Sequence, residues 1–202
     1  YMRRFVLGWK QLGLERSLGG RIVTYADDLV ILCRKGKAAE ALLRLREIMG
    51  KLKLTVNERK TRICRVPGET FDFLGYTIGS CYSFRRRRSY LGMRPKKGAV
   101  LRICRAISEM TSRRWLFLSE EELVRRLNQR LGGWANYFQL GSVSKAYHAV
   151  DRHVTYRLRK WLRGKHQLGR RGTARFSYPY LYQTLGLIRL PMLPRFFPWA
   201  NA

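Results

Sequence analysis

The chain has 202 residues and a formal net charge of +29 at pH 7, with 42 Lys and Arg against 13 Asp and Glu. Hydrophobic residues make up 46% of it and aromatic residues 12%, which excludes a disordered basic tail because such tails lack the side chains that build a core. A positive excess of this size favours a polyanion as partner: nucleic acid first, an anionic membrane surface second, and an acidic protein only as a distant third.

Two further classes are excluded by the distribution of residue types. No apolar run approaches the roughly 18 to 20 residues of a bilayer span, and the first ten residues lack the hydrophobic stretch of a signal peptide. Cys33, Cys64, Cys81 and Cys104 form no C-x-x-C pair and have no nearby histidine pair, so a zinc site is not expected. These features predict a cytoplasmic protein with free thiols and no membrane partner.

The first predicted element is a β-hairpin. The runs GGRIVTY and LVILCR are rich in β-branched and aliphatic residues, and they enclose the tip Ala26, Asp27 and Asp28. From Gly36 onward, apolar residues recur at steps of three and four and predict a helix with one apolar stripe. The stripe consists of Ala39, Leu42, Leu45, Met49 and Leu52.

More β-structure is expected after this helix. Short extended segments are predicted around residues 57–61, and a second hairpin begins within 71–76, with Gly75 and Gly79 as its flexible points. The order of strand, strand, helix, strand and strands predicts an α+β sheet domain over residues 1–80.

The composition changes beyond this domain. Residues 1–80 hold 16 basic and 8 acidic side chains, whereas residues 81–202 hold 26 and 5, so the polyanion is expected mainly against the second part. Residues 81–97 contain four consecutive arginines, then a proline and two lysines, which is typical of a basic linker or long loop.

Three apolar stripes with helical spacing then predict an all-α three-helix unit over residues 98–170. Ser119, three residues before Glu122, forms a capping-box pattern at the start of the second helix, and Ser142 is the expected cap of the third. The stripes run over 100–110, 123–138 and 143–161.

The outward faces of these helices are expected to carry cations, and most aromatic residues are expected in the core. Trp115, Trp134, Tyr137, Tyr156 and Trp161 also have the second interpretation that some of them stack on unpaired bases. The cations are Arg113, Arg114, Arg125, Arg126, Arg130, Arg152, Arg157, Arg159, Lys160 and Arg163. The last segment, 171–202, is predicted to be a basic, irregular, proline-containing arm packed by Tyr178, Tyr180, Tyr182, Phe196, Phe197 and Trp199.

The pair Asp27 and Asp28 is the strongest sign of chemistry. Two adjacent carboxylates at a hairpin tip repel each other unless a divalent cation lies beside them, and hard oxygen ligands suit Mg²⁺. In a two-metal phosphoryl-transfer site, one ion activates the attacking hydroxyl and the other holds the triphosphate and the leaving group. An isolated Asp-Asp turn is usually a solvated turn, but the flanking strands and the net charge favour the metal site here.

Four motifs follow one another along the chain: YADD between two strands, LTVNERKT, FDFLGY, and a basic helical unit with LNQRLGGWANYF and YRLRKWLRGKH. In this order they resemble the group II intron reverse transcriptase/maturase family, over nearly all of residues 1–190. The resemblance implies that 1–80 are the C-terminal part of the polymerase palm and 98–170 the thumb, or maturase domain. It also implies an RNA-directed DNA polymerase that uses Mg²⁺, binds intron RNA and a template–primer duplex, and assists intron splicing and mobility.

The resemblance implies roles for individual residues. Asp27 and Asp28 match the metal-binding aspartates, and Tyr25 and Ala26 match positions beside the primer terminus and the incoming nucleotide. Lys60 matches a lysine near the triphosphate, whose amine could neutralise or protonate the leaving pyrophosphate, although an ordinary surface lysine is the alternative. The primer grip is matched by Phe73, Leu74, Gly75 and Tyr76.

The RNA contacts are expected from the basic segments. The arginine run either contacts phosphate or forms a solvated loop, and both interpretations stay open. The expected RNA-binding residues are Arg85, Arg86, Arg87, Arg88, Arg113, Arg114, Arg125, Arg126, Arg130, Arg159, Lys160 and Arg163.

The family pattern also includes parts that these residues do not match. A palm of this kind needs a further metal-binding aspartate from an earlier strand and a fingers region, yet the only acidic residue before Tyr25 is Glu15. Position 1 is Tyr and Met2 follows it, so we expect a piece of a longer protein. By itself the chain is expected to be inactive as a polymerase and to need the missing N-terminal fingers and palm fragment. The alternative is a non-catalytic splicing factor that only binds intron RNA.

Overall fold

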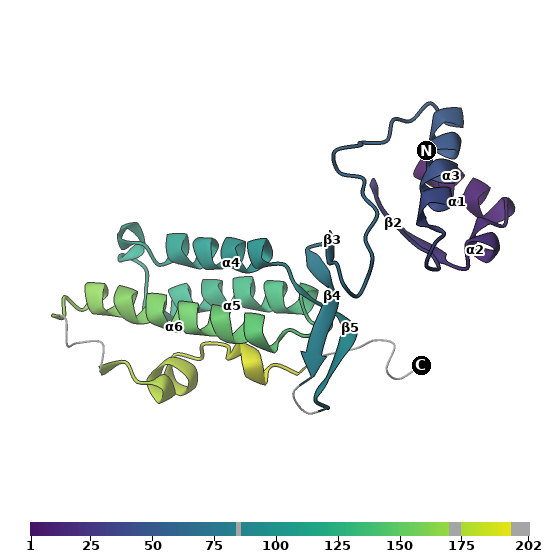
Figure 1. Cartoon of the computed structure of the whole chain (residues 1–202). Coiled ribbons are helices and arrows are strands. Elements are labelled where there is room, and N and C mark those ends of the chain that lie inside the picture. Colours follow the sequence, from purple (N-terminus) through teal and green to yellow (C-terminus); the bar gives the residue numbers. More distant parts are fainter. Residues whose placement is uncertain (84–85, 170–174, 195–202) are drawn as a thin grey trace. The chain divides into compact units, whose positions relative to one another are not determined.

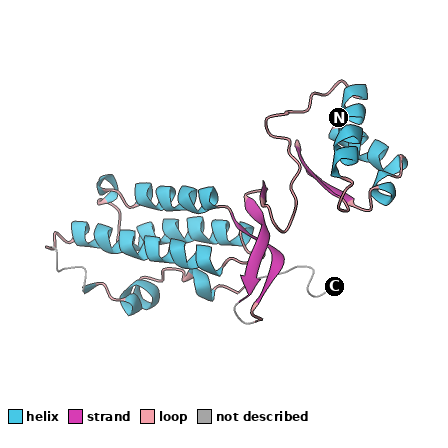
Figure 2. Cartoon of the chain, viewed as in Figure 1, coloured by secondary structure: helices cyan, strands magenta, loops and turns pink. Residues whose placement is uncertain are grey.

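A computed structural model of the chain describes residues 1–83, 86–169 and 175–194. The fold mixes helices with two small antiparallel sheets, in agreement with the predicted α+β class (Figures 1 and 2). The chain divides into two units, Tyr1–Phe73 and Leu74–Ala202, whereas the sequence suggested that the first domain ends at residue 80. Each unit is described by itself below.

Unit 1 combines helices with the predicted first hairpin. The strands pair antiparallel with Tyr25 opposite Asp28, so the connecting loop is only Ala26 and Asp27, and the hairpin prediction is confirmed. The elements of unit 1 are α1 (Met2–Gln11), α2 (Leu14–Ser17), β1 (Arg21–Tyr25), β2 (Asp28–Leu32), α3 (Ala38–Lys51) and β3 (Phe71–Phe73).

The core of unit 1 lies between its helices and the hairpin. Phe5 and Trp9, one helical turn apart on α1, are its largest fully buried side chains, and sequence reasoning did not predict this helix. The helix α3 was predicted, but its buried face includes Ala41 and Ile48, while Ala39 of the expected stripe is exposed. The change from Ala39 to Ala41, two residues along the helix, alters the buried apolar area little because alanine contributes little of it.

The connection between α3 and β3 differs from the prediction. The extended segments expected around residues 57–61 are absent from the described chain, and Asn57 instead accepts backbone hydrogen bonds from the N–H groups of Lys60 and Thr61. Leu54 and Val56 still pack against the core of unit 1. Apolar residues at alternate positions therefore mark contact with the core here, and not a strand.

Unit 2 begins with a second hairpin, made of β4 (Tyr76–Ser83) and β5 (Arg88–Pro95). The strands are antiparallel, with Gly79 opposite Gly92. Residues 81–97 were expected to be a linker, but they contain the end of β4, all of β5 and the start of the next helix. A Cβ atom at Gly92 would lie 2.7 Å from the Tyr90 ring, so the strand needs glycine there.

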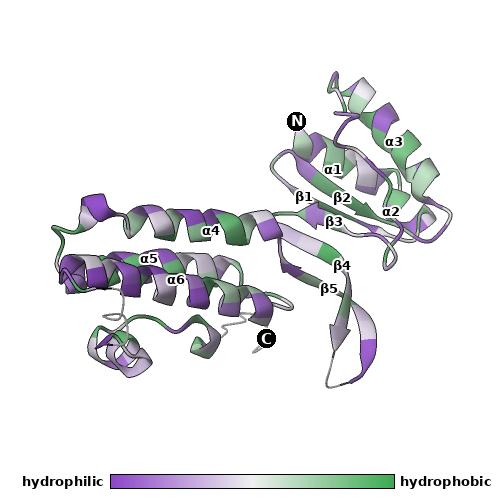
Figure 3. Cartoon of the chain, turned by 60° about the vertical axis from the view of Figure 1, so that its left-hand side comes forward, coloured by the Kyte–Doolittle hydropathy of each residue, from purple (hydrophilic) through white to green (hydrophobic). Residues whose placement is uncertain are grey.

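Three long helices follow the hairpin in unit 2, as the sequence predicted (Figure 1). Figure 3 shows hydrophilic and hydrophobic residues interleaved along each of them, as expected for helices with one buried face. Their shared core includes Ile107, Leu127, Val150 and Leu158, all fully buried. The helices are α4 (Lys97–Met110), α5 (Glu120–Tyr137) and α6 (Ser144–Lys165).

The two predicted caps have different outcomes. The hydroxyl oxygen of Ser119 accepts a hydrogen bond from the backbone N–H of Glu122 at 3.1 Å, so the cap of α5 is confirmed. The expected cap of α6 is wrong, because Val143 occupies the N-cap position. The Ser142 hydroxyl instead lies 2.7 Å from the Tyr90 hydroxyl of β5.

The segment after α6 folds back onto the helices. The side chains of Phe176, Leu181, Leu187 and Leu190 are buried in the same core as α4–α6. Its short helical elements are a π-helix, η3 (Tyr180–Thr184), and a 3₁₀-helix, η4 (Leu190–Met192); a further 3₁₀-helix, η1 (Arg113–Trp115), precedes α5. Phe196, Phe197 and Trp199, expected to pack this arm, lie outside the described residues.

None of the helices in the described ranges is long and apolar enough to cross a membrane.

Candidate functional site

The β1–β2 hairpin presents the two aspartates at its tip. The side chains of Asp27 and Asp28 are exposed, and Tyr25 beside them is 65% exposed. Ala26 has a φ of 49°, in the left-handed region, which a two-residue loop requires but a residue with a Cβ atom adopts rarely. The tight loop therefore places both aspartates at the hairpin tip.

The aspartates suit a hard cation but do not form a complete site. Within the described ranges, neither carboxylate has a hydrogen-bond or ion-pair partner, although the chain has 42 Lys and Arg residues. Exposed carboxylate oxygens with open coordination are typical ligands of Mg²⁺. However, that part of the chain contains no group of three or more His, Cys, Asp or Glu residues that could hold a metal ion. Asp27 and Asp28 therefore fit one part of a magnesium site.

Lys60 lies in the turn that follows α3. Glu58 in this turn accepts two hydrogen bonds from Arg46 of α3, at 3.1 and 2.7 Å, which ties the turn to the helix. The Lys60 side chain is exposed, and among the described residues no hydrogen bond or ion pair joins it to either aspartate. The structure thus fixes the base of the turn but brings Lys60 into no contact with the carboxylates.

The predicted primer-grip turn is held by aromatic side chains of unit 2. Leu74 and Gly75 have φ values of 49° and 77°, a pair of left-handed residues that makes a tight turn between strands. The Tyr137 hydroxyl donates to the Leu74 carbonyl at 2.9 Å, and the Tyr76 hydroxyl donates to the Tyr137 carbonyl at 2.7 Å. Burial raises the pKa of Tyr76, so its hydroxyl stays a donor.

The turn also packs against the C-terminal end of α5. A Cβ atom at Gly75 would lie 3.2 Å from the Phe138 ring, and the Gly75 carbonyl accepts the backbone N–H of Lys96 at 2.8 Å. Phe73, the first predicted grip residue, ends β3 in unit 1. The sequence singled out the turn, and it named Tyr137 only as a core or base-stacking residue. It offered no signal for the contact between them, because a contact 63 positions apart has no local pattern.

The arginine run lies at the far end of the β4–β5 hairpin. Arg85 is outside the described residues, while Arg86 and Arg87 form an exposed turn and Arg88 begins β5. Arg87 has a φ of 45°, and the backbone N–H of Arg86 donates to the Ser83 hydroxyl at 3.3 Å. The segment is therefore a hairpin tip that presents cations to solvent.

The predicted cations of α5 are partly neutralised by one carboxylate. Glu122 accepts hydrogen bonds from Arg125 at 2.9 Å and from Arg126 at 2.6 Å. These two guanidinium groups lower the pKa of Glu122 to about 2. Arg126 and Arg114 also lie over the Trp115 ring, at 5.8 and 5.5 Å from its centroid. Arg113 and Arg130 are exposed.

Arg157 was predicted to lie on the outward face of its helix, and this prediction is wrong. Its guanidinium donates to the Ser108 carbonyl at 2.7 Å, the Thr111 carbonyl at 3.2 Å and the Thr111 hydroxyl at 3.0 Å. These acceptors lie at the C-terminal end of α4, where a positive charge is favoured by the helix dipole. Arg157 therefore joins α6 to α4 and is unavailable to a polyanion.

The helical part of unit 2 matches a known family. Residues 100–178 match the family model described as group II intron, maturase-specific domain. This part of the chain is therefore similar to the maturase-specific domain of group II introns. A comparison with curated proteins finds no match. The family match includes all of α5 and α6 and most of α4, and it ends at Tyr178.

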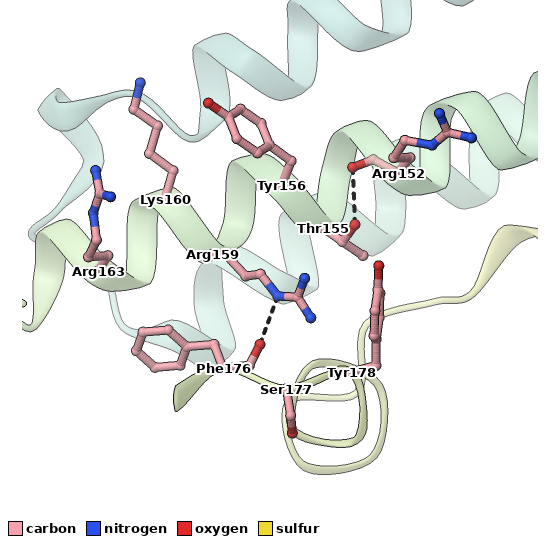
Figure 4. A pocket seen from close by; sticks show the side chains of 9 residues that line it. All are labelled: Arg152, Thr155, Tyr156, Arg159, Lys160, Arg163, Phe176, Ser177 and Tyr178. Atoms are coloured by element: carbon pink, nitrogen blue, oxygen red, sulfur yellow. Dashed lines mark hydrogen bonds between the residues drawn. The ribbon is translucent and has the colours of Figure 1, made fainter. Parts of the chain in front are cut away.

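The region matched by the family model has an open pocket of about 600 Å³ along α6 (Figure 4). Its lining combines cations of the helix, among them Arg152, Arg159 and Lys160, with residues 176–178 of the returning segment. Arg159 donates through Nε to the Phe176 carbonyl at 2.7 Å. Helical spacing in the sequence shows that the α6 residues of the lining lie close together. The contribution of residues 176–178 to the lining follows only from the tertiary fold.

Proposed function

We propose that this chain is the C-terminal region of a group II intron reverse transcriptase/maturase. The family match over residues 100–178 carries the proposal, because it identifies unit 2 independently of the short palm motifs. In this proposal unit 2 binds intron RNA and assists its splicing. Unit 1 contributes the palm hairpin with Asp27 and Asp28 and the turn with Lys60.

The charge of unit 2 supports the binding role. Residues 81–202 hold 26 basic and 5 acidic side chains, and several cations on the helices are exposed. Contacts with phosphates release condensed counterions, so the affinity for RNA should fall steeply with salt. A protein with roughly 6–10 phosphate contacts loses about 10³–10⁵ in affinity between 50 and 200 mM salt.

The polymerase part of the proposal depends on unit 1. When bound at Asp27 and Asp28, Mg²⁺ would supply the charge that activates a primer hydroxyl and holds a triphosphate. Tyr25 and Ala26 adjoin Asp27 and Asp28 at the hairpin tip, which supports the proposal that they lie beside the primer end and the incoming nucleotide. Because the described residues offer two adjacent carboxylates and no third, we propose that polymerase activity needs a further carboxylate and a template-binding part from outside these 202 residues.

One observation also favours a non-catalytic splicing factor. The described residues hold no group of three or more His, Cys, Asp or Glu residues that could bind a metal ion. In that case Asp27 and Asp28 are a solvated turn, and the basic helices stabilise folded intron RNA without chemistry. Both candidates share RNA binding and differ only in the role of the hairpin.

The two candidates separate in one set of assays. The chain is mixed with a second fragment that supplies fingers and the further aspartate, and primer extension with Mg²⁺ is compared for wild type and Asp27→Ala. Extension that depends on Asp27 supports the polymerase. Intron splicing without extension would show a splicing factor alone. Failure to bind intron RNA at low salt would reject both.

A further inference from the structure

The exposed face of α6 carries a tyrosine between cations. Arg152, Tyr156 and Lys160 follow one another at steps of four residues, and Arg163 lies three residues further, so they share one face of the helix. The Tyr156 ring is 62% exposed. Within the described ranges, the side chains of the three cations form no hydrogen bond or ion pair.

The other two aromatic residues of the pocket, Phe176 and Tyr178, already have protein partners, and the Phe176 side chain is buried in the core. The Arg159 guanidinium lies over the Tyr178 ring, 4.3 Å from its centroid, and Tyr178 is parallel to Tyr182 within 7° at 6.1 Å. Figure 4 shows Arg159 pointing toward residues 176–178, whereas Tyr156 and Lys160 project away from that segment. Tyr178 is 55% exposed, but Arg159 already covers its ring, whereas among the described residues no ring or cation lies against Tyr156. Tyr156 is therefore the ring that we assign to a ligand.

The charge around this ring has one sign. Among the described residues that line the pocket there is no Asp or Glu. The neighbouring carboxylate, Asp151, accepts a hydrogen bond from the Tyr182 hydroxyl at 2.8 Å. A ligand for this site must combine negative charge with a flat ring, and the volume of about 600 Å³ lies within the roughly 300–1,000 Å³ of small-ligand sites.

We infer that the pocket binds an unpaired nucleotide of RNA. The base stacks on Tyr156, and the phosphates on either side of it contact Arg152, Lys160 and Arg163. A base-paired duplex keeps its bases stacked inside the helix, so it would use the cations but not the ring. This inference rests on the proposed RNA-binding function and narrows the ligand at this site to a single-stranded or bulged segment.

The test compares two RNAs and a set of variants of the whole chain. The probes are a single-stranded oligoribonucleotide of about 12 nucleotides with a central 2-aminopurine, and a blunt RNA duplex of the same length. Tyr156→Ala should weaken single-strand binding by about 5- to 100-fold and remove the fluorescence quenching of the stacked base. Tyr156→Phe should retain both, and duplex affinity should be unchanged in every Tyr156 variant.

Two further variants make the result specific. Tyr156→Leu keeps apolar volume without a ring and should behave like the alanine variant. Phe117→Ala removes another aromatic side chain of unit 2, 74% exposed, and should change neither affinity. Circular dichroism checks that each variant keeps its helices.

Three outcomes would overturn the inference. Unchanged single-strand affinity in Tyr156→Ala, with wild type binding both RNAs, rejects the stacking site and leaves the proposed function intact. An equal loss for single strand and duplex also rejects it, because stacking cannot act on the duplex. If wild type binds neither RNA, the proposed function fails together with the site.

Discussion

Replacing Gly75 by alanine tests whether the Leu74–Gly75 turn is held in place by its packing against α5. Gly75 has a φ of 77°, and a Cβ atom there would lie 3.2 and 3.3 Å from two carbon atoms of the Phe138 ring. The left-handed conformation alone costs a residue with a Cβ atom about 1–2 kcal/mol. Because the ring is buried and must also move, we expect Gly75→Ala to lower the free energy of unfolding of unit 2 by about 1–3 kcal/mol.

A glycine in α5 provides the matched control. Gly133 has helical geometry, and a Cβ atom there would meet nothing within 4 Å. Gly133→Ala should therefore raise the free energy of unfolding of the same unit by about 0.5–1 kcal/mol. The same substitution is thus expected to stabilise at position 133 and to destabilise at position 75.

Guanidinium unfolding followed by tryptophan fluorescence measures both changes. Trp134 lies 5.1 Å from Phe138 between ring centroids, so its emission reports on the region of the turn. A Gly75→Ala variant as stable as wild type would refute the left-handed turn and its packing on Phe138. Destabilisation by both variants would instead show that the region tolerates no added methyl group, and the argument from φ would fail.

The remaining predictions concern capping, charge and the corrected arginine. Ser119→Ala should cost about 1 kcal/mol in the unfolding of unit 2, because the N–H of Glu122 loses its acceptor. Glu122 has its pKa lowered from 4.5 to about 2 in the folded chain, so the stability it contributes is present above pH 4.5 and is lost as the pH falls toward 2. The difference in unfolding midpoint between wild type and Glu122→Gln should accordingly vanish at low pH. Arg157→Ala should lower the free energy of unfolding by about 1–3 kcal/mol, since it leaves buried acceptors unpaired, while RNA affinity of the folded variant stays unchanged.

Each of these three predictions would be contradicted by a specific result. Ser119→Asn or Ser119→Asp should retain the cap, so a loss as large as that of alanine would contradict the capping role. A Glu122→Gln difference that persists at pH 2 would show that its charge is not the source. If Arg157→Ala lowered RNA affinity without loss of stability, Arg157 would be an RNA-binding residue and the structural role would be wrong.

Much of the fold follows from local patterns in the sequence. The β1–β2 hairpin and the helices α4–α6 were predicted, because strand and helix periodicity depends on residues a few positions apart. The cap at Ser119 was visible for the same reason. Where the local pattern was ambiguous, as around residues 57–61, the prediction of extended structure was wrong.

Some features of the candidate site likewise follow from the sequence, and others do not. The sequence by itself determined that Asp27 and Asp28 share a hairpin tip, and that Arg152, Tyr156 and Lys160 share one helix face. The sequence also determined the excess of positive charge, because net charge depends on composition alone.

Only the tertiary structure decided which of these groups are free to act. Tyr137 reaches the Leu74 carbonyl across 63 positions, and Arg157 turns inward to the end of α4 across 46 to 49 positions. Residues 176–178 return to α6 and occupy Arg159, which leaves Tyr156 exposed beside unpaired cations. Such contacts depend on how distant segments pack, and neither composition nor periodicity records that.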